Sequence, residues 1–297
     1  MMSDLKQSFE NVAYEKAHQL FGRLAWSELF SGAIRTADSG FVVGTHLEAA
    51  LKRDKHLIKD STLKDAFMLK KGKTYKAGDT MRRADLAETF RRLAKDGAAS
   101  FYNGSVRDDL LADLAELTKS SDPDSVASLL TAEDFRVYQP RVYESLAVPL
   151  TGPHTESQTQ GGNWTLYSVR PPGSGALLGF ILNVMSGYKD IYNEATHKSE
   201  DDSALFYHRL IETFKYAYAK RMQFGDELFD RDVKSLVDQI VTTKFAERTR
   251  TAIDDSRTYE PSHYGTVSVM RNDHGTAHVS VVDSQGNAAA VSTTINL

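Results

Sequence analysis

The residues whose types and spacing could do chemistry lie at the carboxyl end of the sequence. Thr276 follows a glycine and opens a run that alternates polar and β-branched residues over 278–282. Alternation with a period of two residues predicts a strand. Residues 283–287 contain Asp, Ser, Gly and Asn, which favour turns, and residues 288–295 are typical of a returning strand. The sequence therefore predicts a β-hairpin that begins with a threonine.

The register of this hairpin decides which side chains meet. If Val282 pairs with Ala288, counting outward along both strands places Thr276 opposite Thr294. Because side chains alternate between the two faces of a strand, Asn296 would share the face of these two threonines. We therefore expect a hydroxyl directly opposite a second hydroxyl, with a carboxamide diagonally beyond it. A register slip of one residue would destroy this arrangement.

A threonine hydroxyl becomes a useful nucleophile when a base removes its proton. At a chain terminus the threonine's own α-amine can serve, because its pKa is near neutrality and its position is fixed covalently. Thr276 is internal, so the Gly275–Thr276 bond would first have to be cut. Gly275 suits this step, since glycine tolerates a strained backbone that exposes its carbonyl to Thr276 Oγ. The alternative is an ordinary turn into a hairpin, and these residues alone favour that alternative.

Composition bounds the class of protein. The sequence has 297 residues, of which 41% are hydrophobic and 26% charged, as expected for a globular chain of one or two domains. A net charge of −4 without a long basic block argues against a nucleic-acid partner. The absence of cysteine excludes disulfides, thiolate metal sites and a cysteine nucleophile. The longest apolar stretch, residues 175–185, is too short to span a bilayer, and residues 1–4 do not open a signal peptide.

The pattern of apolar residues predicts a mostly helical body with few strands. Residues 9–60 predict consecutive helices interrupted at Gly22 and Gly40. Strands are expected at 142–150, at 164–169 and in the C-terminal hairpin. The other main helices are expected at 84–95, 105–117, 176–185, 205–222, 233–240 and 244–253. The core positions expected in the first helices are Phe9, Val12, Leu20, Leu24, Leu29 and Ile34.

Smaller signals refine this interpretation. Residues 131–134 predict a capped helix start, and the polar segment 188–203 predicts a surface loop. His208 and Glu212 share a helical face, and a solvated pair is the default interpretation of such a spacing. In the long helix, Leu210, Phe214 and Ala217 are expected to face inward.

No cofactor or metal is predicted. The glycines at 173 and 175 are wrongly spaced for a dinucleotide loop and no alternating βαβ pattern surrounds them. His274 and His278 would not share a helical face, and no glutamate lies between them, so a zinc site is not expected. Glycosylation sequons begin at Asn103 and Asn163, and they matter only in a secreted protein.

Several segments resemble the γ-glutamyltranspeptidase family. Residues 207–221, followed by Gly225 and Asp226, resemble the long helix of that family, and residues 273–282 with 293–297 resemble its cleavage region. These matches occur in the family's order and are specific when taken together. Further segments that resemble the family's large subunit are 17–26, 101–104 and 131–134.

The resemblance implies an α+β fold, the αββα sandwich of N-terminal-nucleophile hydrolases, incomplete in this chain. It implies a precursor that cuts itself before Thr276, so that residues 1–275 belong to a large subunit and residues 276–297 begin the small subunit paired with it. By similarity, Thr276 attacks the γ-glutamyl amide of glutathione or a related compound, and the group passes to water, an amino acid or a dipeptide. Thr294 would position Thr276, and Asn296 would contact the glutamyl α-amino or α-carboxylate group. The resemblance also implies a protein outside the cell or at its surface.

Parts of the family pattern lie outside this sequence. The family's large subunit starts earlier, with an arginine for the glutamyl α-carboxylate. Its small subunit continues beyond Leu297, with acidic residues, a serine pair and a glycine pair that forms the oxyanion hole. Two interpretations follow: part of a working γ-glutamyl enzyme, or a catalytically silent truncated paralogue with a binding or regulatory role.

Overall fold

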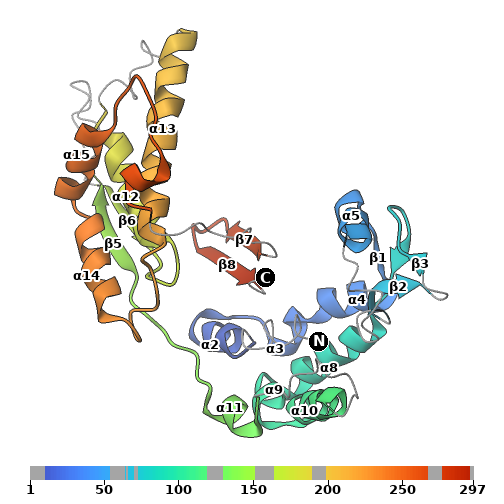
Figure 1. Ribbon diagram of the computed structural model, residues 1–297. Helices are drawn as coiled ribbons and strands as arrows, with labels where there is room; N and C mark the ends of the chain where they lie inside the picture. The colour runs from blue at the N-terminus through green and yellow to red at the C-terminus, as the bar shows by residue number, and fades with distance from the viewer. Residues whose placement is uncertain are drawn as a thin grey trace. The chain divides into compact units, whose positions relative to one another are not determined.

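The computed structural model describes residues 11–53, 64, 66–69, 73–118, 130–150, 164–188, 199–266 and 276–294. The chain divides into two compact units (Figure 1). Unit 1 combines residues up to Arg141 with those from His274 onward, and unit 2 is Val142–Asp273. Within the described ranges, helices predominate and the strands form four two-stranded antiparallel sheets. None of the helices in these ranges is long and apolar enough to cross a membrane.

Unit 1 begins with the predicted succession of helices. The interruption at Gly40 is confirmed: this glycine has a φ of 91°, which favours a residue without a side chain, and its amide donates to Thr36 O at 3.0 Å. The sequence did not predict the short strand β1 (Phe41–Val42), which pairs with β4 (Thr80–Met81). The helices are α2 (Asn11–Phe21), α3 (Trp26–Leu29), α4 (Ser31–Ser39) and α5 (Thr45–Arg53).

Half of the core positions predicted for these helices are wrong. Leu20, Leu24 and Leu29 are exposed, with 61% of Leu24 accessible, whereas Val12 packs against the core. Ile34 is half-buried, and Phe9 lies outside the described residues. The helical spacing of apolar residues does not show which side of these helices packs inward. Ala37, which was not among the predicted positions, is one of the residues that are buried.

The main core of unit 1 is formed by the helices that follow. Phe135 is fully buried, and its ring lies 5.7 Å from that of Phe101. The predicted cap at residues 131–134 is confirmed, because Thr131 and Asp134 exchange side-chain and backbone hydrogen bonds. These helices are α8 (Ala84–Asp96), α9 (Ala99–Asn103), α10 (Ser105–Thr118) and α11 (Ala132–Val137). A short antiparallel strand pair, β2 (Met68–Leu69) and β3 (Lys73–Thr74), precedes them in the chain.

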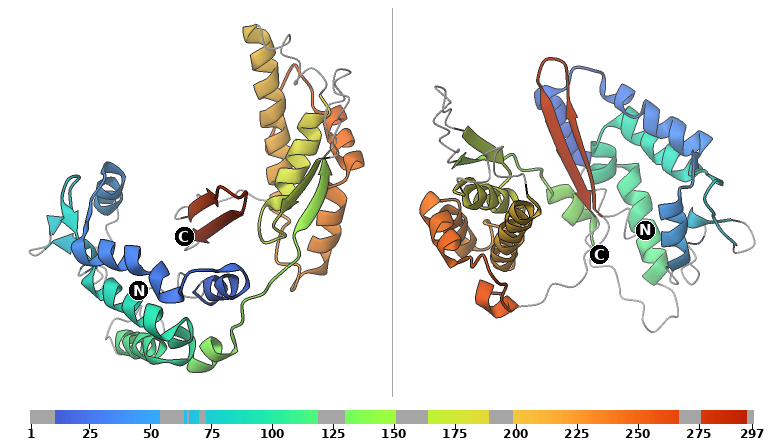
Figure 2. Two further views of the ribbon diagram at one scale, coloured as in Figure 1. Left: turned by 180° about the vertical axis from the view of Figure 1, so that it is seen from behind. Right: turned by 90° about the horizontal axis from the view of Figure 1, so that it is seen from above.

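Unit 2 is built around the apolar helix α12 (Gly175–Ser186), which packs against strands on one side and helices on the other (Figure 2). At Gly179 the helix approaches a strand so closely that an added Cβ would lie 2.9 Å from Val148 Cγ2. Phe180 and Val184 are fully buried on this helix. The neighbours of α12 are β5 (Leu146–Leu150), β6 (Trp164–Ser168), α13 (Glu200–Arg221), α14 (Arg231–Ile240) and α15 (Thr243–Ala252).

The long helix α13 starts earlier than its apolar pattern predicts. Ser199 Oγ accepts a hydrogen bond from the amide of Asp202 at 3.1 Å, which caps the helix, so the loop predicted for 188–203 is wrong at residues 200–203. Residues 189–198 lie outside the described residues. Of the positions predicted to face inward, Ala217 is buried, Leu210 is half-buried and Phe214 is 39% exposed.

Glu212 on α13 is a buried carboxylate, and the predicted solvated pair with His208 is wrong. Only 1% of Glu212 is exposed, and its oxygens accept hydrogen bonds from Lys215 Nζ at 2.7 Å and Tyr264 OH at 2.6 Å. Thr258 Oγ1 donates to the same carboxylate at 2.7 Å. His208 instead bonds the carbonyl of Asp254 through Nε2 at 2.8 Å.

Because of the Glu212 carboxylate, we expect the folded protein to lose stability in acid. Burial raises the pKa of Glu212, but the hydrogen bonds from Lys215, Tyr264 and Thr258 lower it by more, so the folded-state pKa lies below 4.5. A depressed folded-state pKa stabilises the protein fully above pH 4.5, and this stabilisation is lost as the pH falls through the folded value. We expect Glu212→Gln to melt at a lower temperature than wild type at neutral pH, with the gap closing in acid. A gap independent of pH in thermal melts would contradict this assignment.

Candidate active site

The C-terminal hairpin has the register that the sequence predicts. Strand β7 (Thr276–Val282) pairs antiparallel with β8 (Ala288–Thr294), with Val282 opposite Ala288 and Thr276 opposite Thr294. The predicted end of the second strand at residue 295 lies outside the described residues. Thr276 is thus the first residue of its strand and faces the last described residue of the partner strand.

The turn between these strands explains why the register is fixed. Asp283 Oδ1 accepts hydrogen bonds from the amides of Gln285 at 2.9 Å and Asn287 at 2.8 Å, and Asn287 Nδ2 donates to Asp283 Oδ2 at 2.8 Å. Hydrogen bonds from the side chain and backbone of Asn287 hold the pKa of Asp283 below its usual value. Gly286 has a φ of 82°, as expected for a turn glycine. The loop length and these bonds allow one alignment of the two strands.

The two threonines at the start of the hairpin contact each other directly. Thr276 Oγ1 donates a hydrogen bond to Thr294 Oγ1 at 2.9 Å. The side chain of Thr276 is exposed and that of Thr294 is half-buried. A hydroxyl whose proton is directed toward a fixed acceptor has its lone pairs oriented, which is what an attacking oxygen requires.

The other predicted site residues are only partly described. Gly275 and Asn296 lie outside the described residues, so their roles stay predictions. Among the two candidate glycosylation positions, Asn103 is exposed at the end of α9, and Asn163 lies outside the described residues.

A histidine and two serines extend the polar face beside the threonine pair. His278 Nδ1 lies 2.7 Å from Ser292 Oγ, and His278 Nε2 lies 2.9 Å from Ser280 Oγ. The spacing of His274 and His278 in the sequence does not predict a zinc site, and no other role is predicted for His278 from the sequence. The signal was available in the alternation itself, since Thr276, His278 and Ser280 occupy every second position of one strand.

The fold of this chain is shared with solved γ-glutamyltranspeptidases and with an acylase. Solved structures with this fold include the γ-glutamyltranspeptidase of Helicobacter pylori, with a TM-score of 0.68 and 23% identity over 88% of this chain and 69% of that one. A cephalosporin acylase from Bacillus halodurans gives a TM-score of 0.67 and 21% identity over 95% of this chain and 47% of that one. The predicted α+β class is confirmed. In the described part of this chain the strands form separate pairs, which leaves the predicted sandwich incomplete.

Sequence comparison identifies the family to which the chain belongs. The family profile described as Gamma-glutamyltranspeptidase matches residues 10–297, so the chain belongs to the γ-glutamyltranspeptidase family. It is 39% identical over 282 residues to Scoloptoxin SSD14 of Scolopendra dehaani, covering 94% of this chain and 45% of that protein. It is 31% identical over 285 residues to the glutathione hydrolase 5 proenzyme of Rattus norvegicus, covering 95% of this chain and 46% of that protein. The chain thus spans slightly less than half the length of these relatives.

Proposed function

We propose that this protein is the precursor of an enzyme that transfers γ-glutamyl groups from glutathione and related compounds, with Thr276 as the nucleophile. The observation that carries the proposal is the Thr276–Thr294 hydroxyl pair, joined at 2.9 Å at the start of a hairpin whose register is fixed by its turn. Family membership and the word proenzyme in the rat relative's name support the same conclusion. The large subunit would comprise residues 1–275 and the small subunit would begin at Thr276.

The first chemical step would be cleavage of the precursor at Gly275–Thr276. Thr276 Oγ attacks the Gly275 carbonyl carbon, a C–O bond forms, the C–N bond breaks, and the hydroxyl proton passes to the departing amine. Water then adds to the resulting ester, which yields a Gly275 carboxylate and a Thr276 with a free hydroxyl and a free α-amine. This step creates the base that the later reaction uses.

Turnover would repeat the same attack on a γ-glutamyl amide. The α-amine of Thr276 accepts the hydroxyl proton, Oγ bonds to the γ-carbonyl carbon, and the amide C–N bond breaks as the leaving amine takes the proton. Water or the amine of an amino acid or dipeptide then attacks the ester and releases Thr276. Thr294 would hold the nucleophile's hydroxyl in place, and Asn296 would contact the glutamyl α-amino or α-carboxylate group.

The test uses the protein expressed from its natural transcript. We expect mass spectrometry to find one fragment ending at Gly275 and another beginning at Thr276, and we expect the cleaved protein to hydrolyse a γ-glutamyl anilide. An intact chain without hydrolysis would refute the proposal and favour the alternative, a catalytically silent member of the family with a binding or regulatory role. Cleavage at another bond would refute the assignment of Thr276.

Extracellular or cell-surface placement is part of this proposal. Asn103 is exposed at the end of α9, where a glycan can attach without displacing core residues. Protein recovered from a eukaryotic secretory host should therefore lose mass on treatment with a glycosidase that removes N-linked sugars, and Asn103→Gln should remove part of that change.

A further inference from the structure

Beside the threonine pair, an imidazole connects the two strands of the hairpin. His278 lies directly opposite Ser292, and its Nδ1 is 2.7 Å from Ser292 Oγ. On the other side of the ring, Nε2 is 2.9 Å from Ser280 Oγ of the same strand. The imidazole is therefore held by one hydroxyl across the hairpin and by another along its own strand.

The backbone pairing of the hairpin leaves the contact between the two threonines to their side chains. The amide of Asp283 donates to Asn287 O at 2.9 Å, and from this hydrogen-bonded pair the strands continue in unbroken register. Hydrogen-bonded and non-hydrogen-bonded pairs alternate along an antiparallel ladder, so counting outward makes Thr276–Thr294 a non-hydrogen-bonded pair. The backbone groups of these two residues point away from each other, and the bond between their hydroxyls joins them directly.

We propose that His278 is a positioning residue for the nucleophile, an inference that rests on the proposed function. The bridge from His278 to Ser292 lies two positions further into the hairpin than the threonine pair, on the same face. A cross-strand side-chain contact holds neighbouring strands together locally, so this bridge limits their separation where Thr276 and Thr294 must stay in contact. Without it, Thr276 Oγ would spend a smaller fraction of the time in the orientation from which it attacks.

The hydrogen bonds of this bridge do not require one protonation state of the ring. A neutral imidazole donates from one nitrogen and accepts at the other, an imidazolium donates from both, and a serine hydroxyl can either donate or accept. The contact between His278 Nδ1 and Ser292 therefore persists in both states of the ring. A general base differs, because it accepts a proton only in its neutral form. An amide side chain that reproduces the Nδ1 contact should consequently replace His278.

The main test compares two serine variants of the protein expressed from its natural transcript. Ser292→Ala removes the partner of the ring across the hairpin, and Ser280→Ala removes the partner on the same strand, and both serines are exposed. We expect Ser292→Ala to slow the appearance of the Thr276 terminus, and to lower the kcat/KM of the cut protein on a γ-glutamyl anilide, by roughly tenfold each. Ser280→Ala should stay within about twofold of wild type, because water can replace its hydroxyl. Thermal melts of the two variants should coincide.

Replacements of His278 itself separate positioning from proton transfer. The amide of asparagine occupies the place of Nδ1, so His278→Asn should keep most of the wild-type kcat/KM and the shape of its pH profile. His278→Ala has no group that reaches Ser292 and should lose as much as Ser292→Ala. The double variant should lose no more than either single variant, because both changes remove the same contact. A loss in His278→Asn as large as that in His278→Ala overturns the inference.

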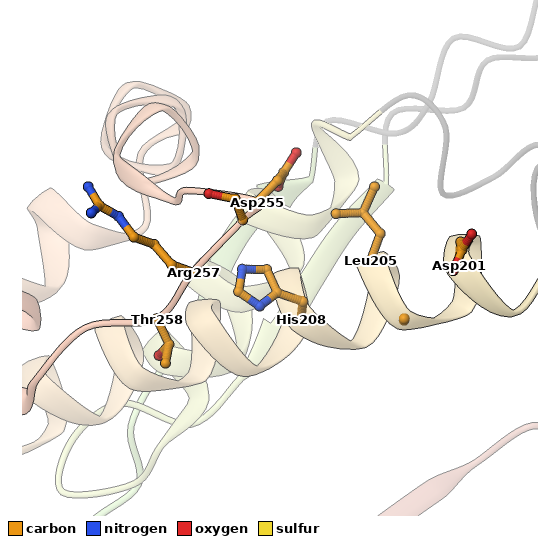
Figure 3. A pocket seen from close by; sticks show the side chains of 8 residues that line it. Asp201, Leu205, His208, Asp255, Arg257 and Thr258 are labelled. Atoms are coloured by element: carbon orange, nitrogen blue, oxygen red, sulfur yellow. The ribbon is translucent and has the colours of Figure 1, made fainter.

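A histidine outside the hairpin provides a matched control. Figure 3 shows His208 of α13 beside Asp255 and Thr258, where these residues line an open hollow of about 480 Å³. Its Nε2 bonds the carbonyl of Asp254 at 2.8 Å, so its described partners belong to unit 2. His208→Asn should therefore keep the wild-type rates of cleavage and turnover. A loss in His208→Asn equal to that in His278→Ala overturns the inference, because it would show that the effect is not specific to the hairpin.

The outcomes distinguish this inference from the proposed function. A wild-type protein that is not cut, or a Thr276→Ala variant that is, overturns both. Wild-type rates in Ser292→Ala overturn the inference alone, and so does an equal fall in Ser280→Ala. If Ser292→Ala fails to fold, the comparison of His278→Ala with His278→Asn decides the question.

Discussion

Thr276→Ala is expected to leave the precursor uncut and to lower hydrolysis of a γ-glutamyl anilide by at least about 10⁴-fold, as loss of a nucleophile does in other hydrolases. The variant lacks the oxygen that donates to Thr294 at 2.9 Å, and no α-amine is released to act as base. Cleavage is measured by mass spectrometry of the fragments, and activity by release of the anilide's amine. Thr276→Ser keeps a hydroxyl at the same position and should retain both reactions at reduced rates.

A matched control is available on the other face of the hairpin. Thr293 is also a strand threonine, but it pairs with Ala277 and its side chain points away from the face of Thr276. Thr293→Ala should therefore be cut and should turn over substrate. Activity that survives in Thr276→Ala, or is lost equally in Thr293→Ala, would show that the hydroxyl of Thr276 is not the attacking group.

Phe180→Ala is expected to cause the largest loss of stability among single changes in unit 2, about 3–5 kcal/mol. Phe180 is fully buried on α12, beside Val184, Ala217 and Ala246, and its ring lies edge-on to that of Phe245 at 5.5 Å. Truncation removes these contacts and leaves a cavity between α12 and its neighbouring helices. Hydrogen exchange of the α12 amides measures the free energy of opening and should fall by that amount.

The control for this change lies two residues away. Leu178 is on the same helix but 45% exposed, so Leu178→Ala should lower the opening free energy by less than half as much. Equal losses in the two variants would mean that α12 does not form the centre of the unit 2 core.

Local signals in the sequence predicted the candidate site better than they predicted the core. The hairpin register follows from strand alternation and a five-residue turn, and both are encoded by neighbouring residues such as Asp283 and Gly286. The cap at Thr131 was predictable for the same reason. Such features depend on bonds within a few residues of each other.

The features that the sequence did not predict depend on contacts between residues far apart in the chain. Leu24 belongs to an apolar pattern yet is 61% exposed, because helical spacing identifies a stripe but does not say which stripe a neighbouring element covers. Glu212 looked like a surface charge, but its donors Thr258 and Tyr264 lie more than forty residues further along the chain. A buried carboxylate with distant partners leaves no periodic signal.

The order of the two units along the chain has a consequence for chain connectivity. Unit 2 is one continuous segment, whereas unit 1 draws on chain from both sides of it. An uncut chain therefore joins the units by two covalent crossings, at Arg141–Val142 and at Asp273–His274. Breaking the bond before Thr276 would remove the covalent path from unit 2 into the hairpin, so that Arg141–Val142 alone would link unit 2 covalently to the remaining described residues of unit 1, and the entropic cost of closing that loop would be lifted.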